Sequence, residues 1–205
     1  MKQATEVILA SGEHTERMGR AMGKAFQNEP NFTYIIPDEA KRERALQWFF
    51  GTFTARLGFW YGKIYTTPDA LGGAVWMAPG NKVTFGGALR AGLLSMPWRF
   101  GWGGLRRSME ISSHIDRMRK DVAPERHWYL MALGIDPAAQ GKGIGSALVG
   151  PTLAQTDAEA VDCYLETFSE RNVTFYQRFG FEVRGDAQPT KSGIPFWGMV
   201  REPHT

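Results

Sequence analysis

The chain has little of what marks a secreted, membrane-spanning or zinc-dependent protein. Cys163 is the only cysteine among 205 residues, which excludes an internal disulfide and fits a reducing compartment. The apolar run at residues 7–10 is too short for a signal peptide, and no run approaches the ~20 apolar residues of a transmembrane helix. The four histidines lack the paired spacing of a zinc site. We therefore expect a cytoplasmic protein without a metal.

The chain also lacks a large excess of either positive or negative charge. The 24 basic and 21 acidic residues are largely interspersed and leave a net charge of +3, a field too weak to indicate nucleic acid. The nucleophile motif Gly-x-Ser-x-Gly does not occur. Hydrophobic residues make up 43% of the chain and charged residues 22%, which is ordinary for one globular domain. We expect neither a nucleic acid nor a membrane as partner.

Apolar periodicity and turn residues predict a single domain over residues 1–205 that combines strands and helices. Helices are expected before Pro30, after a cap at Asp38, from the glycines near residue 143 to Asp157, and over residues 170–179. Strands are expected at residues 5–10, 59–66, 71–78, 127–135, 161–166, 181–185 and 195–201.

Residues 83–122 look helical, with an interruption at Pro97 and at residues 101–104, and they are rich in tryptophan and basic residues. The favoured interpretation is a helical lid or wall beside a ligand site, over about residues 82–122. An amphipathic surface that touches a membrane is the less favoured alternative.

The stretch around Gly143 carries the strongest functional signal. It follows the predicted strand 127–135, and glycines occupy the alternate positions 141, 143 and 145. Glycine permits positive φ, so successive backbone N–H groups can point into one concavity that a phosphate fills. A helix that begins here adds unsatisfied N–H donors and a partial positive charge. Residues 140–146 therefore predict an anion cradle.

Two nucleotide motifs fail on these residues. A Walker loop needs glycine where Asp136 stands, and the dinucleotide fingerprint needs glycine or alanine where Ser146 stands. The acyl-CoA pattern Gln/Arg-x-x-Gly-x-Gly/Ala matches completely, at Gln140, Gly143 and Gly145.

A second wall is predicted on the helix that follows strand 161–166. Thr167 and Glu170 have the spacing of a capping box, with Ser169 a rival cap. Asn172 and Tyr176 are four residues apart, so an amide and a phenol share one helical face. The alternative is that the tyrosine only packs beside its phenylalanine neighbours.

The anion cradle, followed by the helix with Asn172 and Tyr176, resembles the GNAT superfamily of acyl-CoA N-acetyltransferases. The resemblance is carried by Leu133-Gly134-Ile135, by Gln140-x-x-Gly143-x-Gly145 and by Asn172-x-x-x-Tyr176-x-x-x-Gly180-Phe181. More narrowly, Tyr164-Leu165-Glu166-Thr167 and Arg171-Asn172 look like the branch that contains puromycin N-acetyltransferase. Residues 80–125 carry no motif of the family.

The resemblance implies an α/β (α+β) fold with a mixed, mostly antiparallel central sheet of about six to seven strands flanked by helices. In that fold, strands 127–135 and 161–166 splay apart to hold acetyl-CoA. Main-chain groups at Leu133, Gly134 and Ile135 would contact the pantetheine arm, and Asn172 and Tyr176 would lie along it. The pyrophosphate would be held by Gln140, Gly141, Lys142, Gly143, Ile144, Gly145 and Ser146.

The implied reaction involves two proton transfers: the acceptor amine must lose a proton, and the departing thiolate benefits from gaining one. Tyr176 is the expected general acid for the departing thiolate, although an ordinary tyrosine pKa of about 10 against a thiol pKa of about 8.5 favours hydrogen bonding over full transfer. The strand 127–135 contains no carboxylate. Glu166, at the end of the neighbouring strand, is therefore the candidate base, and a role in orienting the acceptor is equally open.

The leading hypothesis is direct acetyl transfer from acetyl-CoA to the primary amine of a small molecule, an antibiotic or aminonucleoside being one class, with a role in resistance. Acetylation of a protein lysine or N-terminus is one alternative, and a CoA-binding sensor without turnover is another. Cys163 need not take part, because a small buried hydrophobe on a strand explains it. A homodimer is left open.

Overall fold

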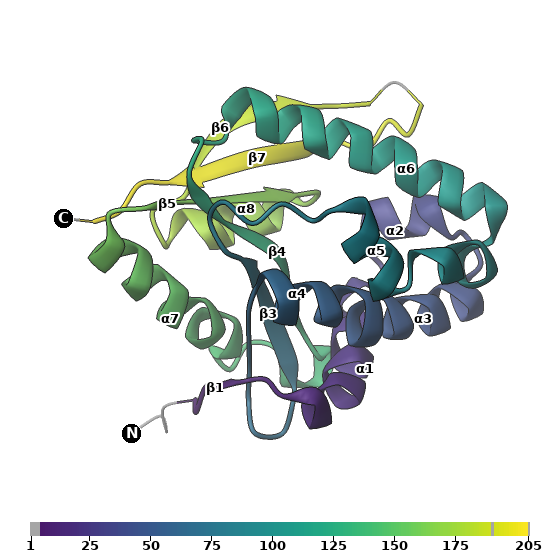
Figure 1. The fold of residues 1–205 in the computed structure, drawn as a ribbon, viewed down its shortest axis with the longest axis horizontal. Helices are drawn as coiled ribbons and strands as arrows, with labels where there is room; N and C mark the ends of the chain where they lie inside the picture. Colours follow the sequence, from purple (N-terminus) through teal and green to yellow (C-terminus); the bar gives the residue numbers. More distant parts are fainter. Residues whose placement is uncertain (1–4, 190, 205) are drawn as a thin grey trace.

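The computed structural model describes residues 5–189 and 191–204 of the chain. Its centre is a seven-stranded sheet with the strand order β1-β2-β3-β4-β5-β7-β6 (Figure 1). Neighbouring strands are antiparallel except β4 and β5, which are parallel. The mixed, mostly antiparallel sheet is therefore confirmed. The strands are β1 (Ile8–Leu9), β2 (Gly62–Thr66), β3 (Gly72–Met77), β4 (His127–Ile135), β5 (Asp162–Thr167), β6 (Glu182–Ala187) and β7 (Phe196–Arg201).

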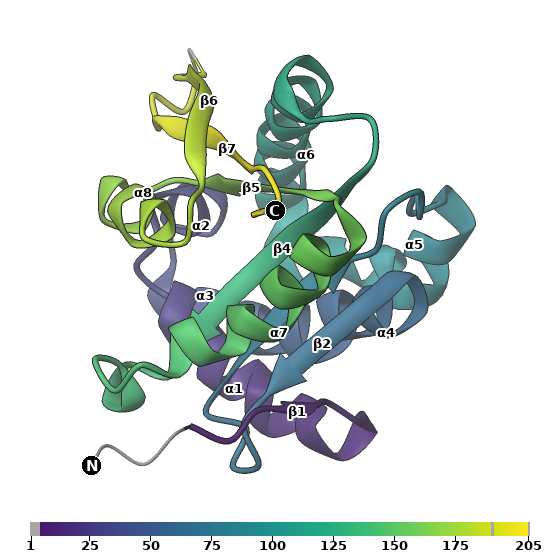
Figure 2. The same ribbon diagram turned by 90° about the vertical axis from the view of Figure 1, so that its left-hand side faces the viewer.

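Helices cover both faces of the sheet, with α7 and α8 on one side and α1, α3 and α4 on the other (Figure 2). The helices are α1 (Thr15–Phe26), α2 (Pro30–Ile35), α3 (Glu39–Trp48), α4 (Ala55–Tyr61), α5 (Phe85–Ala91), α6 (Met96–Val122), α7 (Ile144–Glu159) and α8 (Glu170–Gln177). Short turns of other helix types are η1 (Gly12–His14), the π-helical η2 (Phe49–Thr54), η3 (Leu93–Ser95) and η4 (Pro137–Ala139). None of the described helices is both long enough and apolar enough to cross a membrane.

The two-residue period of β5 separates two environments. Cys163 and Leu165 are buried in the core that α7 and α8 share with the sheet. Tyr164 and Glu166 therefore point to the opposite face, where α6 lies. Burial raises the pKa of the Cys163 thiol to about 11, so it is protonated at neutral pH and inert as a nucleophile.

Strands β4 and β5 pair over only part of their length. Their register runs from His127 opposite Asp162 to Leu130 opposite Leu165, and β4 continues to Ile135 without β5. On its other edge, β4 pairs with β3 through a bulge, because Val75 faces Ala132 whereas Trp76 faces Leu130. An extra residue bends the bulged strand. The predicted splay of these two strands is therefore confirmed.

Several local predictions were wrong at the boundaries. The helix predicted before Pro30 is confirmed as α1, but the start of α2 at Pro30 was missed. Pro97 lies in the first turn of α6 instead of interrupting a helix, and at both positions proline loses no hydrogen bond. The interruption predicted at residues 101–104 is confirmed at Gly101, with φ 76° and ψ 160°. Residues 59–61 are helical rather than extended, since the apolar stripe of α3 continues through η2 into α4. Ser169, not Thr167, is the N-cap of α8.

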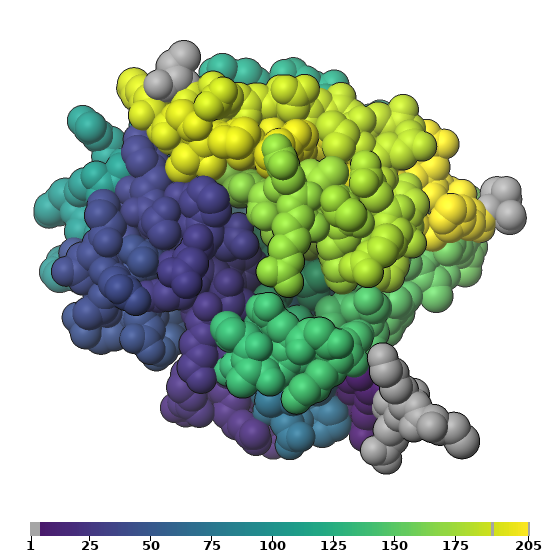
Figure 3. Space-filling view, turned by 180° about the vertical axis from the view of Figure 1, so that it is seen from behind, coloured from purple at the N-terminus to yellow at the C-terminus, as the bar shows by residue number. Residues whose placement is uncertain are grey.

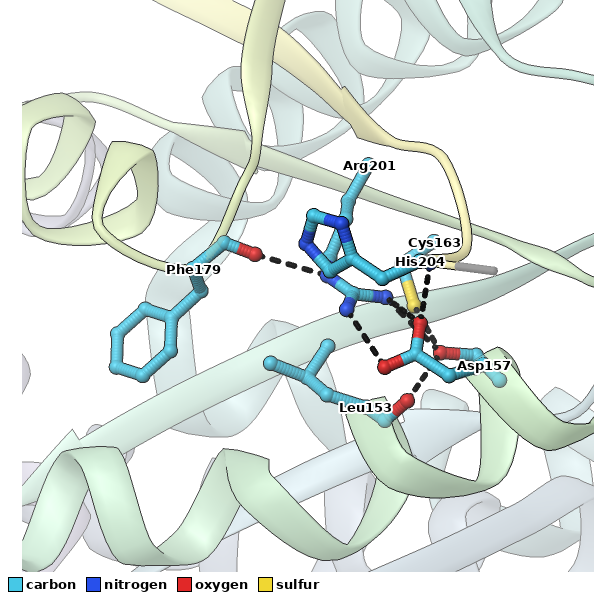
Figure 4. Close-up of polar contacts among 7 residues, drawn as sticks. Leu153, Asp157, Cys163, Phe179, Arg201 and His204 are labelled. Carbon is cyan, nitrogen blue, oxygen red and sulfur yellow. Dashed lines mark hydrogen bonds and ion pairs between the residues drawn. The ribbon is translucent and has the colours of Figure 1, made fainter.

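The end of the chain is tied to α7 by a buried ion pair (Figure 4). The Arg201 side chain is 3% exposed and its Nη1 and Nη2 lie 2.8 and 2.9 Å from the two carboxylate oxygens of Asp157. Its Nε donates to Phe179 O at 2.8 Å, and His204 N donates to Asp157 Oδ1 at 2.8 Å. One guanidinium thus joins α7, β7 and the turn after α8.

Loss of this guanidinium should destabilise the fold, because it leaves the Asp157 carboxylate partly buried without its partner. We expect Arg201→Leu to lower the free energy of unfolding by about 3 kcal/mol in urea titrations. Arg184→Leu is the matched control, since Arg184 pairs with Glu182 and Glu202 at the surface and should cost less than about 1 kcal/mol. Equal effects of the two variants would contradict this role.

Candidate functional site

The loop between β4 and α7 is held in place by its own polar side chains. Asp136 Oδ1 accepts a hydrogen bond from Ala138 N at 3.0 Å, and Lys24 lies 3.1 Å from Asp136 Oδ2. The Ala138 N–H, and then Lys24, lower the pKa of Asp136. Gln140 Nε2 donates to Ile135 O at 3.1 Å, across the base of the loop. The Gln140 side chain therefore braces the loop, and its own contact with a donor stays a prediction.

Glycine is required in this loop by backbone conformation. Gly141 has φ 76° and Gly143 has φ 85°, a backbone conformation that other residues rarely adopt. Space does not exclude a side chain, because a Cβ at either position would meet no atom within 4 Å. Gly143 is the N-cap of α7, so the helix begins one residue later, at Ile144. The glycines at 141 and 143 thus precede the helix instead of forming its first turn as predicted.

The first amides of α7 lack acceptors within the helix, as the predicted anion cradle requires. The first hydrogen bond of the helix runs from Ala147 N to Gly143 O at 3.0 Å. The amides of Ile144, Gly145 and Ser146 therefore have no acceptor within the helix. Those orphan N–H groups and the helix dipole favour a phosphate or pyrophosphate. Lys142 is exposed beside them and adds a positive charge.

Main-chain direction at the end of β4 follows from one hydrogen bond. Asp136 N donates to Leu71 O at 2.8 Å, and the two residues continue the β3–β4 register. Because N–H and C=O groups alternate sides along an antiparallel strand, Gly134 points its groups to β3, whereas Leu133 and Ile135 point theirs away. β5 does not pair with this part of β4. The Leu133 groups and the Ile135 N–H are therefore open to a ligand.

Glycine is needed at position 134 for a different reason, which is close packing of a helix. A Cβ there would lie 2.8 Å from the Phe26 ring and 3.3 Å from the Ala25 Cβ, so glycine lets α1 pack directly on β4. Because its own N–H and C=O point to β3, the predicted contact of Gly134 with a donor is less direct than that of its neighbours and stays a prediction.

The second wall is α8, which carries Asn172 and Tyr176. The Tyr176 ring is buried against Phe175 and Phe181, with ring centroids 5.1 and 5.8 Å away. Burial, and then the charge of Glu29, raise the pKa of Tyr176. The phenol is therefore protonated at neutral pH, as a proton donor must be. Asn172 is half-buried on the same helix.

Sequence reasoning missed Glu29, which faces Tyr176 from the turn between α1 and α2. Burial raises the pKa of Glu29, and the charge of Arg171 opposes that shift. The α1–α2 region and the α8 region lie on the two sides of a hollow above the loop before α7 (Figure 3). No motif marks Glu29, because its neighbourhood depends on how α2 approaches α8.

Glu166 lies in a buried polar cluster on the α6 side of the sheet. Burial raises the pKa of Glu166 to about 7, although Arg119 and the hydroxyl groups of Tyr129 and Tyr164 lower it. Arg119 comes from α6, with its guanidinium 4.9 Å from the centroid of the Tyr129 ring, and it pairs with Asp116. Among the described residues, Glu166 Oε1 has no hydrogen-bond partner. A carboxylate that titrates near neutral pH can accept a proton from a substrate.

Tyr176 and Glu166 therefore lie on different elements: Tyr176 packs in the core that α7 and α8 share with the sheet, whereas Glu166 lies on the α6 side. The unpaired amides of α7 follow the open edge of β4. Within residues 5–189 and 191–204, no group of three or more histidine, cysteine or acidic side chains could hold a metal ion. Such a site suits transfer of an activated group carried on a phosphate-bearing donor.

Comparison with known proteins agrees with this geometry. The family model described as "Acetyltransferase (GNAT) domain" matches residues 110–183, which run from α6 through the loop before α7 and through α8 into β6. This part of the chain is similar to a GNAT acetyltransferase domain. The match contains Glu166 and Tyr176, whereas Glu29 lies outside it.

Two curated relatives are longer than this chain. An uncharacterized N-acetyltransferase, C550.08 of Schizosaccharomyces pombe, is 30% identical over 151 residues, which are 70% of this chain and 61% of the relative. Mycothiol acetyltransferase of Propionibacterium freudenreichii is 43% identical over 67 residues, which are 31% of this chain and 21% of the relative. The chain thus spans less than two thirds of either relative.

Solved structures share the GNAT fold over nearly the whole chain. One described as histone acetyltransferase HPA2 and related acetyltransferase, from Corynebacterium glutamicum, has a TM-score of 0.67 at 22% identity and covers 99% of this chain and 98% of its own. PaiA N-acetyltransferase from Thermoplasma acidophilum, solved with coenzyme A, has a TM-score of 0.56 at 13% identity and covers 98% and 99%. At these identities the likeness shows the fold alone.

The loop glycines give a direct test of the anion site. Gly141→Ala and Gly143→Ala should each weaken acetyl-CoA binding about tenfold in calorimetric titration, because alanine resists positive φ by about 1–2 kcal/mol. Gly86→Ala is the matched control, since Gly86 is an exposed helical glycine whose added Cβ also meets nothing within 4 Å. Unchanged affinity in both loop variants would contradict the assignment.

Proposed function

We propose that the protein transfers an acetyl group from acetyl-CoA directly to the primary amine of a small molecule. The observation that carries the proposal is the buried Glu166 carboxylate, whose pKa is about 7, on the strand that diverges from β4. An ordinary exposed glutamate, with a pKa near 4.3, would accept a proton from an amine far less readily. The GNAT domain around Glu166 supplies the reaction class.

The residues present fit acetyl-CoA. The amides of residues 144–146 and the Lys142 ammonium suit the pyrophosphate, and the main-chain groups of Leu133 with the Ile135 N–H suit the amide groups of the pantetheine arm. When bound, acetyl-CoA supplies an acetyl group activated as a thioester. That a GNAT-fold structure has been solved with coenzyme A supports the assignment.

In the proposed reaction, Glu166 takes a proton from the acceptor ammonium, directly or through water. The neutral nitrogen then attacks the thioester carbonyl carbon, a C–N bond forms and the C–S bond breaks. Tyr176 donates a hydrogen bond or its proton to the departing sulfur, and the nitrogen of the new amide releases its second proton to Tyr176 or to water. Deprotonating an amine of pKa near 8 at pH 7 costs about 1.4 kcal/mol, against about 4.6 kcal/mol for a lysine-like amine. A base matters most for the more basic acceptors.

Aromatic side chains beside Glu166 support a small, partly apolar acceptor. Phe168 follows two residues later and stacks on Phe196, with ring centroids 5.3 Å apart. Phe168 also packs against the buried cluster that includes Ile35, Phe100 and Ile111. An antibiotic or an aminonucleoside has this mixture of amine and flat apolar surface. The similar proteins named above do not include one named as a member of the puromycin N-acetyltransferase branch. A role in antibiotic resistance is therefore proposed from the sequence motifs alone.

The decisive experiment measures release of CoA thiol across a panel of amines that includes antibiotics, aminonucleosides, polyamines and a lysine peptide. Wild-type protein should turn over small amines, and the Tyr176→Phe variant should lose about tenfold or more in kcat while the Kd of acetyl-CoA changes little. Tyr65→Phe, on β2, is the matched control and should keep full turnover. Turnover of the peptide alone would identify a protein acetyltransferase, and no turnover with any amine would leave a CoA-binding sensor.

The pH dependence tests Glu166 as the base. The base must be ionised, so below its pKa of about 7 the activity that depends on Glu166 should rise about tenfold per pH unit and then level off. We expect the kcat/KM ratio of wild type to Glu166→Gln to follow this curve, because ionisation of the same amine cancels in the ratio. Glu170→Gln, an exposed α8 variant, should give a flat ratio near one. A flat ratio for Glu166→Gln would show that Glu166 only orients the acceptor.

A further inference from the structure

Large apolar side chains are exposed in one region of the molecule, from α4 to the first half of α6. Trp98 is 81% exposed, Trp102 77%, Phe85 73%, Leu94 69% and Met109 65%. A lid over the cleft would bury such aromatic side chains against its ligand. Their exposure to solvent therefore needs another explanation.

These residues sit on connected elements. The α5 helix packs against α4 and η3, and η3 packs against α6. A shared apolar cluster beneath them includes Leu57, Ala91 and Met96, one from each region. On α6 itself, Trp102, Arg106 and Met109 follow the helical spacing of one solvent-facing stripe. We name residues 82–109 the aromatic-basic surface.

The charge of the aromatic-basic surface has one sign. No aspartate or glutamate occurs between Asp69 and Glu110. The same stretch contains five cationic residues, which are Lys82, Arg90, Arg99, Arg106 and Arg107. This local run is concealed by the small net charge of the whole chain.

We propose that the aromatic-basic surface docks on an anionic lipid bilayer. Tryptophan, phenylalanine, leucine and methionine can enter the boundary between headgroups and acyl chains, while arginine and lysine remain at the phosphates. The surface is distinct from the Glu166 and Tyr176 site and requires no acetyl transfer. It also reverses the sequence-based expectation of no membrane partner, because exposure, which the sequence does not give, decides between a lid and a docking surface.

Charge disfavours the other occupants. A symmetric dimer through this surface would place the same four exposed cationic residues of two copies against each other, without a carboxylate from residues 70–109 to pair with them. They are Lys82, Arg90, Arg99 and Arg106, whereas Arg107 donates to Ile35 O inside the molecule. A nucleic acid would supply the negative charge, but it gives no apolar environment for Leu94 and Met109, which are largely exposed. An anionic bilayer satisfies both the charge and the apolar side chains.

Vesicle sedimentation tests the docking with the full chain. We expect binding to vesicles enriched in phosphatidylglycerol that is at least about tenfold stronger than binding to phosphatidylcholine vesicles, and that weakens in high salt. The double variant Trp98→Ser/Trp102→Ser should lose at least about tenfold in binding to the anionic vesicles. Arg99→Gln/Arg106→Gln should lose most of the preference for anionic lipid.

The controls change matched residues elsewhere. Leu9→Ser/Val183→Ser removes exposed apolar side chains outside the surface, and Arg17→Gln/Arg44→Gln removes exposed charges outside it. Both should bind like wild type. The tryptophan variant should keep its thermal midpoint and its affinity for acetyl-CoA, since both side chains are exposed.

Three results would overturn the proposal. The first is no binding to anionic vesicles at low salt. The second is a wild-type dimer in light scattering that Trp98→Ser/Trp102→Ser converts to a monomer, which would make a second copy the occupant. The third is binding to a DNA or RNA duplex that the same variant abolishes, together with vesicle binding that it does not change. Because the assay contains neither acetyl-CoA nor an amine, its failure leaves the proposed acetyl transfer untouched.

Discussion

The divergence of β4 from β5 is the constraint on which the candidate site depends. Parallel pairing stops at Leu130, and the bulge between β3 and β4 turns the rest of β4 away from its neighbour. Main-chain groups on that free edge have lost their strand partner and must find water or a ligand. The loop that follows brings the unpaired amides of α7 to the same end. A single break in a ladder thus leaves a row of unpaired main-chain groups inside an otherwise paired sheet.

The side chains of β5 alternate between the two faces of the sheet, and this alternation places different chemical groups on each face. Leu165 enters the core under α7, so Glu166 must point to the face beneath α6. There it meets Arg119 together with two tyrosines, yet burial still outweighs their effect and brings its pKa to about 7. Tyr176 is also buried, and because its neutral form is the protonated one, burial keeps the proton on. The same physical cause raises the pKa of the proposed base, Glu166, and of the proposed acid, Tyr176.

The local parts of the site could be predicted from the sequence. The acyl-CoA pattern, the strand over 127–135 and the helical spacing of Asn172 and Tyr176 are short-range features that depend on a few neighbouring residues. The boundaries near Pro30 and Tyr61 could not, since proline both starts and ends helices and an apolar stripe does not mark its own end. Gln140 was placed correctly in the loop, but its side chain braces Ile135, which the motif does not state.

By itself, the sequence predicted an acyl-CoA donor and the resemblance to the GNAT superfamily, because the acyl-CoA pattern involves only contiguous residues. Only the tertiary structure decided which groups tune that site. Glu29 and Arg119 come from distant segments, and a pKa depends on burial and charge at a point in space. Tertiary structure likewise decided that Trp98 and Trp102 face solvent. A side chain's exposure depends on everything packed around it, which no local pattern contains.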